Sequence, residues 1–132
     1  MPHFTIEYSA NVGARTDMRE VVELVRRTAV ESGIFPIGGI RVRAIRCDDY
    51  AIGDGNPDFG FLAMLLRLGE GRDLAARQAA GEHIFKALAA HLEPVFASSR
   101  FSLSFDMTIN DAATSWKKNN IHTYLKAEAT NG

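Results

Sequence analysis

The chain has 132 residues, a length typical of one domain and too short for two domains with independent hydrophobic cores. Hydrophobic residues make up 46% of the sequence and charged residues 23%, the composition of a folded globular protein and not of a disordered chain. Lysine and arginine number 15 against 16 aspartate and glutamate residues, a formal net charge of -1. The sequence therefore predicts binding neither to nucleic acid nor to an anionic membrane.

The sequence also carries cues to cellular location. Its longest apolar stretch, around 59–66, is much shorter than the roughly 20 residues of a membrane span, so we expect no transmembrane helix. The segment Met1-Pro2-His3-Phe4 lacks the basic and apolar regions of a secretory signal, and we expect it to be the working N-terminus. The single cysteine, Cys47, cannot form an intrachain disulfide. We expect a cytoplasmic protein.

The first half of the chain predicts a strand, a helix and a second strand. Apolar and polar residues alternate from 4 to 8, as in a strand with one buried face. Asp17 is a candidate cap for a helix over 17–32. The β-rich segment 40–47 is the second strand, and its alternation changes phase at Ala44-Ile45, where a bulge would explain the change.

The second half repeats this order. Segment 58–68 is apolar on nearly both faces, as expected of a central strand. Asp73 caps a longer helix that Pro94 ends or kinks, and 101–109 has the clearest period-two alternation in the chain. The tail, which we expect to dock on the body or on a neighbouring subunit before fraying at Asn131-Gly132, carries the apolar residues Trp116, Ile121, Tyr124 and Leu125.

The sequence therefore predicts an α+β fold built from a duplicated βαβ unit. The two halves span roughly 2–56 and 57–112, followed by the tail, within a single domain of residues 1–132. Right-handed crossovers place both helices on one face of a four-stranded mixed sheet and leave the other face for solvent or another subunit. Pro57 precedes the third strand as Pro2 precedes the first, so we interpret the two prolines as counterparts in the repeat.

Several common signatures are absent. The histidines show no metal-ligand spacing, and we expect no metal; they are His3, His83, His91 and His122. The segment Gly69-Glu70-Gly71-Arg72 lacks the Lys-Ser/Thr ending of a phosphate-binding loop, and Gly53-Asp54-Gly55 is a turn between strands. Asp58-Phe59-Gly60-Phe61 shares a Phe-Gly-Phe core with an RNA-recognition strand, but it lacks the basic residue and the later aromatic of that motif. Packing is the better explanation for these phenylalanines.

The unusual feature is Pro2. Removal of Met1 would expose Pro2 as a free secondary amine, whereas the nitrogen of an internal proline is a non-basic amide. A free α-amine has a pKa of about 8, and burial or nearby cations lower it. Attachment to a strand would hold this nitrogen in one place, as general acid–base catalysis requires. The alternative is that Pro2 only starts the strand.

Two arginines are candidates to hold an anionic substrate near this amine. Arg41 begins the second strand after the glycines Gly38-Gly39, which we interpret as flexible. Arg72 directly precedes the Asp73 cap, where free backbone N–H groups also favour an anion. Either guanidinium could bind a carboxylate through two hydrogen bonds, and either could be a solvated surface charge.

These residues resemble the 5-carboxymethyl-2-hydroxymuconate isomerases, a branch of the tautomerase superfamily whose members use an amino-terminal proline. The resemblance spans nearly the whole chain and rests on four segments: Pro2-His3-Phe4, Gly33 to Arg41, Gly69-Glu70-Gly71-Arg72 and Asn119-Asn120-Ile121-His122. It implies a duplicated βαβ fold that assembles as a homotrimer with active sites near subunit boundaries. It also implies that Pro2 is the catalytic base and that Arg41 and Arg72 bind substrate.

The activity that the resemblance implies is isomerisation of a small anionic substrate, a dienol diacid or triacid from aromatic catabolism, without a cofactor. Pro2 would take the proton of the 2-hydroxyl group and return it to C5, while Arg41 and Arg72 bind carboxylates and stabilise enolate charge. The resemblance assigns no role to His3, Asn119, Asn120 or His122.

Three alternatives remain open from the sequence. The first is a promiscuous tautomerase acting on another unsaturated keto acid with the same residues. The second is a non-catalytic trimeric module that binds a ligand and does not use the amine. The third is a ferredoxin-like RNA-binding protein, against which the near-neutral charge argues.

Overall fold

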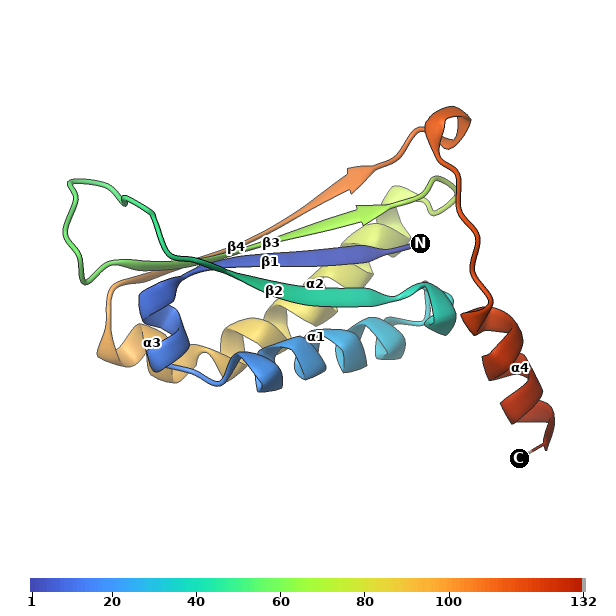
Figure 1. Cartoon of the computed structure of the whole chain (residues 1–132), viewed down its shortest axis with the longest axis horizontal. Helices are drawn as coiled ribbons and strands as arrows, with labels where there is room; N and C mark the ends of the chain where they lie inside the picture. The colour runs from blue at the N-terminus through green and yellow to red at the C-terminus, as the bar shows by residue number, and fades with distance from the viewer. Residues whose placement is uncertain (132) are drawn as a thin grey trace.

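The computed structural model describes residues 1–131; Gly132, where the predicted fraying of the tail ends, lies outside the described residues. Figure 1 shows the elements in chain order. They are β1 (His3–Ser9), η1 (Ala10–Ala14), α1 (Met18–Ser32), η2 (Ile37–Gly39), β2 (Arg41–Cys47), β3 (Gly60–Leu68), α2 (Leu74–His91), α3 (Glu93–Ser98), β4 (Phe101–Ile109), η3 (Ala112–Thr114) and α4 (Ile121–Asn131). Pro94 lies in the first turn of α3, so it follows the end of α2 as expected.

The four strands confirm the duplicated βαβ architecture. Their order in the sheet is β2-β1-β3-β4. Within each unit the two strands pair in parallel, β1 with β2 and β3 with β4, and the units join through the antiparallel pair β1 and β3. In a ferredoxin-like fold the two parallel strands of each βαβ unit are split by another strand. Here they are adjacent, so the ferredoxin-like RNA-binding alternative is wrong.

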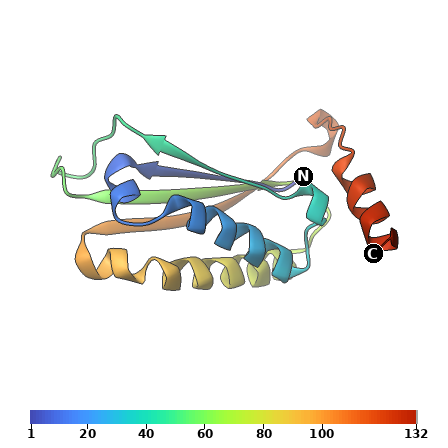
Figure 2. The ribbon, with the colours of Figure 1, turned by 60° about the horizontal axis from the view of Figure 1, so that its bottom comes forward.

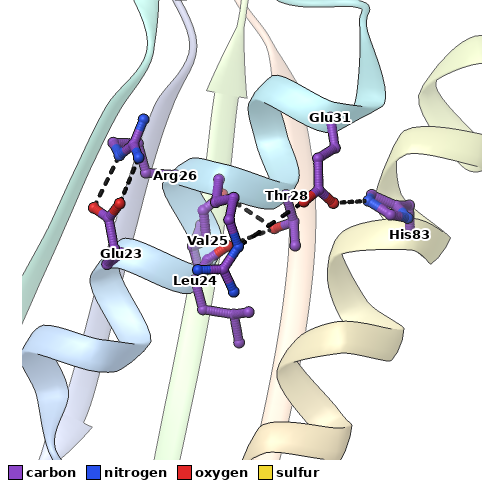
Figure 3. A network of polar contacts seen from close by, with 8 residues as sticks. Glu23, Leu24, Val25, Arg26, Thr28, Glu31 and His83 are labelled. Carbon is purple, nitrogen blue, oxygen red and sulfur yellow. Dashed lines mark hydrogen bonds and ion pairs between the residues drawn. The ribbon is translucent and has the colours of Figure 1, made fainter.

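Both long helices cover one face of the sheet, as Figure 2 shows. Most inward residues of β1 and β3 are fully or almost fully buried beneath them, and the core includes Phe4, Ile6, Leu62, Met64, Leu66, Val25, Ile84 and Leu88. On the surface, His83 of α2 contacts Glu31 of α1 at 2.8 Å. The buried Thr28 hydroxyl donates to carbonyls of its own helix, α1 (Figure 3). Burial of apolar side chains between the helices and the sheet stabilises this arrangement.

The opposite face of the sheet is open. Its rows follow from the strand register: Arg43, Thr5, Leu65 and Asp106 form one row across the four strands, and Arg41, His3, Arg67 and Thr108 form the next. Two apolar side chains on this face, Ile45 and Leu65, are 48% and 42% exposed.

The phase change in the second strand has a different origin from the one predicted. β2 pairs with β1 residue for residue from Arg41 to Cys47, so the strand contains no bulge. Val42 and Ala44 face the core, whereas Ile45 points to the open face. An exposed apolar residue, and not a bulge, interrupts the alternation.

The proposed correspondence of Pro2 and Pro57 is also wrong. Pro2 directly precedes the first paired residue of β1, whereas Pro57 is exposed in a turn three positions before β3. The residue that directly precedes β3 is Phe59. The helix caps do correspond, because Asp17 and Asp73 each accept a backbone N–H of the following helix.

Among residues 1–131, no helix is long and apolar enough to cross a membrane.

Candidate functional site

Four segments that are distant in sequence meet at one end of the sheet. They are the start of β1, the turn η2 before β2, the loop 69–72 before α2, and the tail that leads into α4 (Figure 1). Parallel pairing brings the beginnings of β1 and β2 together, since His3 is opposite Arg41. The antiparallel pairing of β1 and β3 brings the end of β3 to the same place. The segments that the sequence singled out are therefore neighbours.

Pro2 is buried at the head of β1. Its carbonyl accepts the backbone N–H of Arg41 at 3.0 Å, which ties the start of β1 to the start of β2. A Cβ on Gly39 would lie only 3.2 Å from the Cδ atom of the Pro2 ring. Gly39 thus lets η2 pack closely against the proline. In this chain Met1 precedes Pro2, so the Pro2 nitrogen is part of an amide.

The glycines before Arg41 allow close packing because they have no side chain; they do not provide flexibility. Gly38 and Gly39 are both buried in η2, and neither has a positive φ. A Cβ on Gly38 would lie 2.7 Å from Nδ1 of His122 and 3.0 Å from its backbone nitrogen. Close packing of the tail on η2 therefore requires glycine, and the interpretation of this pair as flexible is wrong.

Arg41 turns back over η2. Its Nη1 donates to the Gly38 carbonyl at 2.9 Å and, at 3.4 Å, to the Ile40 carbonyl. The side chain is partly buried at the edge of the sheet. Because a guanidinium has five N–H donors, these contacts leave donors for a ligand.

Arg72 is held by its own loop, 69–72, and by the segment that follows α1. Its Nε donates to the Ile34 carbonyl at 2.8 Å, and its guanidinium carbon lies 5.3 Å from the centre of the Phe35 ring. A longer contact of 3.4 Å joins Nη1 to the Gly69 carbonyl. These contacts fix the guanidinium plane beside the Met1-Pro2 segment, with which Arg72 shares a cavity.

The amine of Met1 lies in a partly buried, cationic environment. Burial is the largest cause that lowers the pKa of this amine, followed by a hydrogen bond with Lys117 and by the charges of Lys117, Arg72 and Arg41. Together they lower its pKa from 8.0 to about 6. An amine at this place is therefore mostly neutral at pH 7 and able to accept a proton.

The tail is joined to the site by Asn119. Its side-chain nitrogen donates to the Gly38 carbonyl at 2.9 Å, the same oxygen that accepts from Arg41. Its side-chain oxygen accepts the backbone N–H of Ile121 at 2.7 Å, at the start of α4. Asn119 therefore links η2, Arg41 and the tail. His122 also packs on η2, whereas Trp116 is 86% exposed and Tyr124 63% exposed.

Two cavities meet at the N-terminus. One, of about 280 Å³, has Pro2, Gly39, Glu70, Arg72, Lys117 and His122 in its walls. The other, of about 270 Å³, lies toward the open face of the sheet and includes His3, Arg67, Asn110 and Trp116. Met1 and Lys117 line both cavities.

The sequence interpretation missed Lys117. It lies in an irregular segment of the tail with no periodicity, and only the fold brings it close to Pro2, 115 positions earlier in the chain. The signal available in the sequence was its place two residues before Asn119, next to a segment already linked to the family.

His3 lies beside the candidate site on the open face of the sheet. Its Nδ1 is 3.2 Å from Nη1 of Arg43. Burial lowers the pKa of His3, and so do the charges of Arg67, Arg43, the N-terminus and Arg41. Within residues 1–131 no group of three histidine, cysteine or acidic side chains is arranged to hold a metal ion.

Comparison with known proteins gives a consistent result. The sequence model of a family described as 5-carboxymethyl-2-hydroxymuconate isomerase matches residues 2–125. A curated 5-carboxymethyl-2-hydroxymuconate Delta-isomerase from Escherichia coli is 35% identical over 126 residues, which cover 96% of this chain and 100% of the relative. The family match includes all three predicted site residues, Pro2, Arg41 and Arg72.

Solved structures agree with these sequence matches. The crystal structure of a 5-carboxymethyl-2-hydroxymuconate isomerase from Deinococcus radiodurans R1 matches with a TM-score of 0.88 and 33% identity, over 94% of this chain and 93% of the other. A structure described as native fused 4-OT matches with a TM-score of 0.58 at 17% identity, over 89% and 94% of the two chains. The latter likeness concerns the fold alone.

Proposed function

The chain belongs to the 5-carboxymethyl-2-hydroxymuconate isomerase family, and on this premise we propose that it is a cofactor-independent isomerase with Pro2 as its general acid–base. Its substrate is an unsaturated 2-hydroxy polycarboxylate, most directly 5-carboxymethyl-2-hydroxymuconate. The observation that carries the mechanism is the place of Pro2 at the head of β1, in one cavity wall with Arg72 and Lys117. Burial and nearby cations lower the pKa of the adjacent Met1 amine there.

The mechanism begins with removal of Met1, which converts the Pro2 amide into a secondary amine. Pro2 then accepts the proton of the 2-hydroxyl group as the enol oxygen becomes a carbonyl oxygen. The electron pair shifts along the conjugated chain to C5, and the protonated Pro2 returns the proton there. The product contains the same atoms as the substrate, and the amine is regenerated.

Arg41 and Arg72 bind carboxylates and stabilise the negative charge that develops during the shift. Arg72 is suited to orient the substrate, because Ile34 and Phe35 hold its guanidinium in place. Arg41 is anchored on the Gly38 carbonyl and starts the strand next to Pro2. Fixed cations that strengthen their interaction with a developing enolate lower the barrier of the reaction.

Replacement of the proline tests this proposal. We expect the mature Pro2 protein to convert the dienol with loss of ultraviolet absorbance, and Pro2→Ala to lose at least about 100-fold in kcat, the usual contribution of a general base. Arg41→Ala and Arg72→Ala should mainly raise KM, or lower kcat because the charged transition state is less stabilised.

Intact mass is the necessary companion measurement. A mature chain that starts at Pro2 permits the mechanism, whereas a chain that retains Met1 favours the non-catalytic binding module. Unchanged turnover in Pro2→Ala, Arg41→Ala and Arg72→Ala would eliminate the mechanism. Turnover of other unsaturated keto acids at equal efficiency would favour the promiscuous tautomerase.

We also propose that the protein is a homotrimer with its active sites near the subunit boundaries. The open face of the sheet carries Ile45 and Leu65, and the exposed tail carries Trp116 and Tyr124, all of them apolar surface that a second copy would cover. Cys47 is free, which fits a reducing cytoplasm as the location.

A further inference from the structure

We propose that Lys117 is a specificity-determining residue that binds the third carboxylate of a tricarboxylate substrate. This inference rests on the proposed function and assigns a role within the same site. It concerns a residue of the tail, outside the four segments on which the family resemblance rests.

The first argument is the position of Lys117. It lines the cavity that contains Pro2 and Arg72, and it also lines the neighbouring cavity that contains His3 and Arg67. Met1 is the other residue that the two cavities share. Removal of Met1 therefore joins the two spaces into one, with the Pro2 nitrogen and the Lys117 ammonium facing the volume that Met1 leaves.

The second argument is the lack of a protein anion for this ammonium. Among the residues that the structure describes, no carboxylate lies within 4.0 Å of the Lys117 ammonium. Its hydrogen bond is to the Met1 amine, a partner that maturation removes. Glu70, the acidic residue in the wall of the Pro2 cavity, makes no ion pair with it. A mature site therefore presents an exposed cation that has no carboxylate of the described residues beside it and is available to a carboxylate of the substrate.

The third argument compares the charges of site and substrate. A 2-hydroxymuconate has two carboxylates, which Arg41 and Arg72 suffice to bind. The carboxymethyl arm adds a third carboxylate on a rotatable bond. A lysine ammonium is a point charge on a flexible stem and accepts a carboxylate from several directions, whereas a guanidinium favours one planar geometry. Lys117 matches the flexible arm.

The position of Lys117 is set by its neighbours in the tail. Two residues later, Asn119 bonds to the Gly38 carbonyl and so fixes the tail to η2. On the other side, the loop at Gly69 approaches closely, because a Cβ there would lie 3.9 Å from the Lys117 Nζ atom. The ammonium is thus placed by the same turns that hold Arg41 and Arg72.

Two substrates test the assignment. Lys117→Gln in the mature Pro2 protein should lower kcat/KM for 5-carboxymethyl-2-hydroxymuconate about tenfold, equivalent to about 1.4 kcal/mol, mainly through KM. Assayed well above the pKa of Pro2, the same variant should stay within about twofold for 2-hydroxymuconate, which lacks the carboxymethyl arm, and Lys117→Arg should recover part of the loss on the tricarboxylate. Lys118→Gln is the matched control, because it removes the same charge from the adjacent exposed residue. An equal loss on both substrates, or none on the tricarboxylate, overturns the assignment.

Binding without turnover separates this inference from the proposed function. Calorimetry measures the affinity of the mature protein for propane-1,2,3-tricarboxylate and for glutarate. Lys117→Gln should weaken tricarboxylate binding selectively, whereas equal effects on both ligands overturn the role of Lys117. If the wild-type protein turns over neither muconate, the proposed isomerase activity fails, and selective binding still supports Lys117 as the residue that recognises the third carboxylate.

Discussion

A single amine dominates the chemistry at the scale of residues. The Met1 amine has its pKa lowered to about 6 by burial and by Lys117, Arg72 and Arg41. Pro2 occupies the adjacent position and, once freed, is exposed to the same cations. We therefore expect the pKa of its amine to lie below that of an ordinary secondary amine. The same cations then favour the neutral form of the amine, which is the base.

The pH profile of the mature enzyme tests this expectation. Because a protonated amine cannot accept the substrate proton, kcat/KM should fall as the pH drops through the pKa of Pro2. Lys117→Gln removes a cation that disfavours the charged amine, so it should raise this pKa. The fall of kcat/KM on the acidic side of the pH profile, its acidic limb, should then move to higher pH. Lys118→Gln should leave the acidic limb in place.

One neighbouring group needs a separate control in this measurement. His3 also has a lowered pKa and lies in the adjoining cavity, and Arg41, Arg67, Arg72, Glu70 and His122 are the other charged or titratable groups around the amine. A limb that disappears in His3→Gln belongs to the imidazole. A limb that persists in His3→Gln and shifts in Lys117→Gln belongs to Pro2.

At the scale of elements, the tail and η2 depend on Asn119. Asn119→Ala removes the bond to the Gly38 carbonyl and the bond to the N–H of Ile121, the first residue of α4. Loss of one such hydrogen bond costs about 1 kcal/mol of stability. We expect faster amide exchange in 117–125 and a raised KM, with little change in the exchange of β1 and β3. Uniformly faster exchange over the whole chain would contradict this.

Asn120→Ala provides the matched control for that variant. Asn120 accepts the Tyr124 N–H through its backbone carbonyl, and this bond does not depend on its side chain. Its substitution should leave both exchange and KM unchanged. If both asparagine variants behave alike, the tail is not held by the Asn119 side chain.

The predictable elements were those whose own residues determine them. Alternation in β1 and β4 and the caps Asp17 and Asp73 depend on local chemistry, and the structure confirms them. The predictions were wrong where contacts between distant segments determine the role of a residue. Gly38 and Gly39 are required by the approach of His122 and Pro2, contacts that no local pattern encodes. Ile45 interrupts the alternation of β2 because its face of the sheet has no helix above it.

The candidate site shows the same division. Pro2, Arg41 and Arg72 were proposed from residue type and place beside predicted elements, and the fold brings them to one end of the sheet; their roles stay predictions. Lys117 and the bridging contacts of Asn119 could not be found this way, because the return of the tail to η2 is a tertiary contact. The assignment of residues 1–132 to one domain likewise stays a prediction.

At the scale of the whole molecule, the open sheet face decides how copies assemble. Leu65 lies in the middle of that face, between Thr5 of β1 and Asp106 of β4, and is 42% exposed. If three copies cover this face, Leu65→Asp buries a carboxylate without a partner at each interface, which costs several kcal/mol. We therefore expect light scattering after size exclusion to show a trimer for the wild type and a monomer for Leu65→Asp. Ala79→Asp, on the exposed side of α2, should remain trimeric. A wild-type monomer, or a Leu65→Asp trimer, would contradict assembly through the sheet.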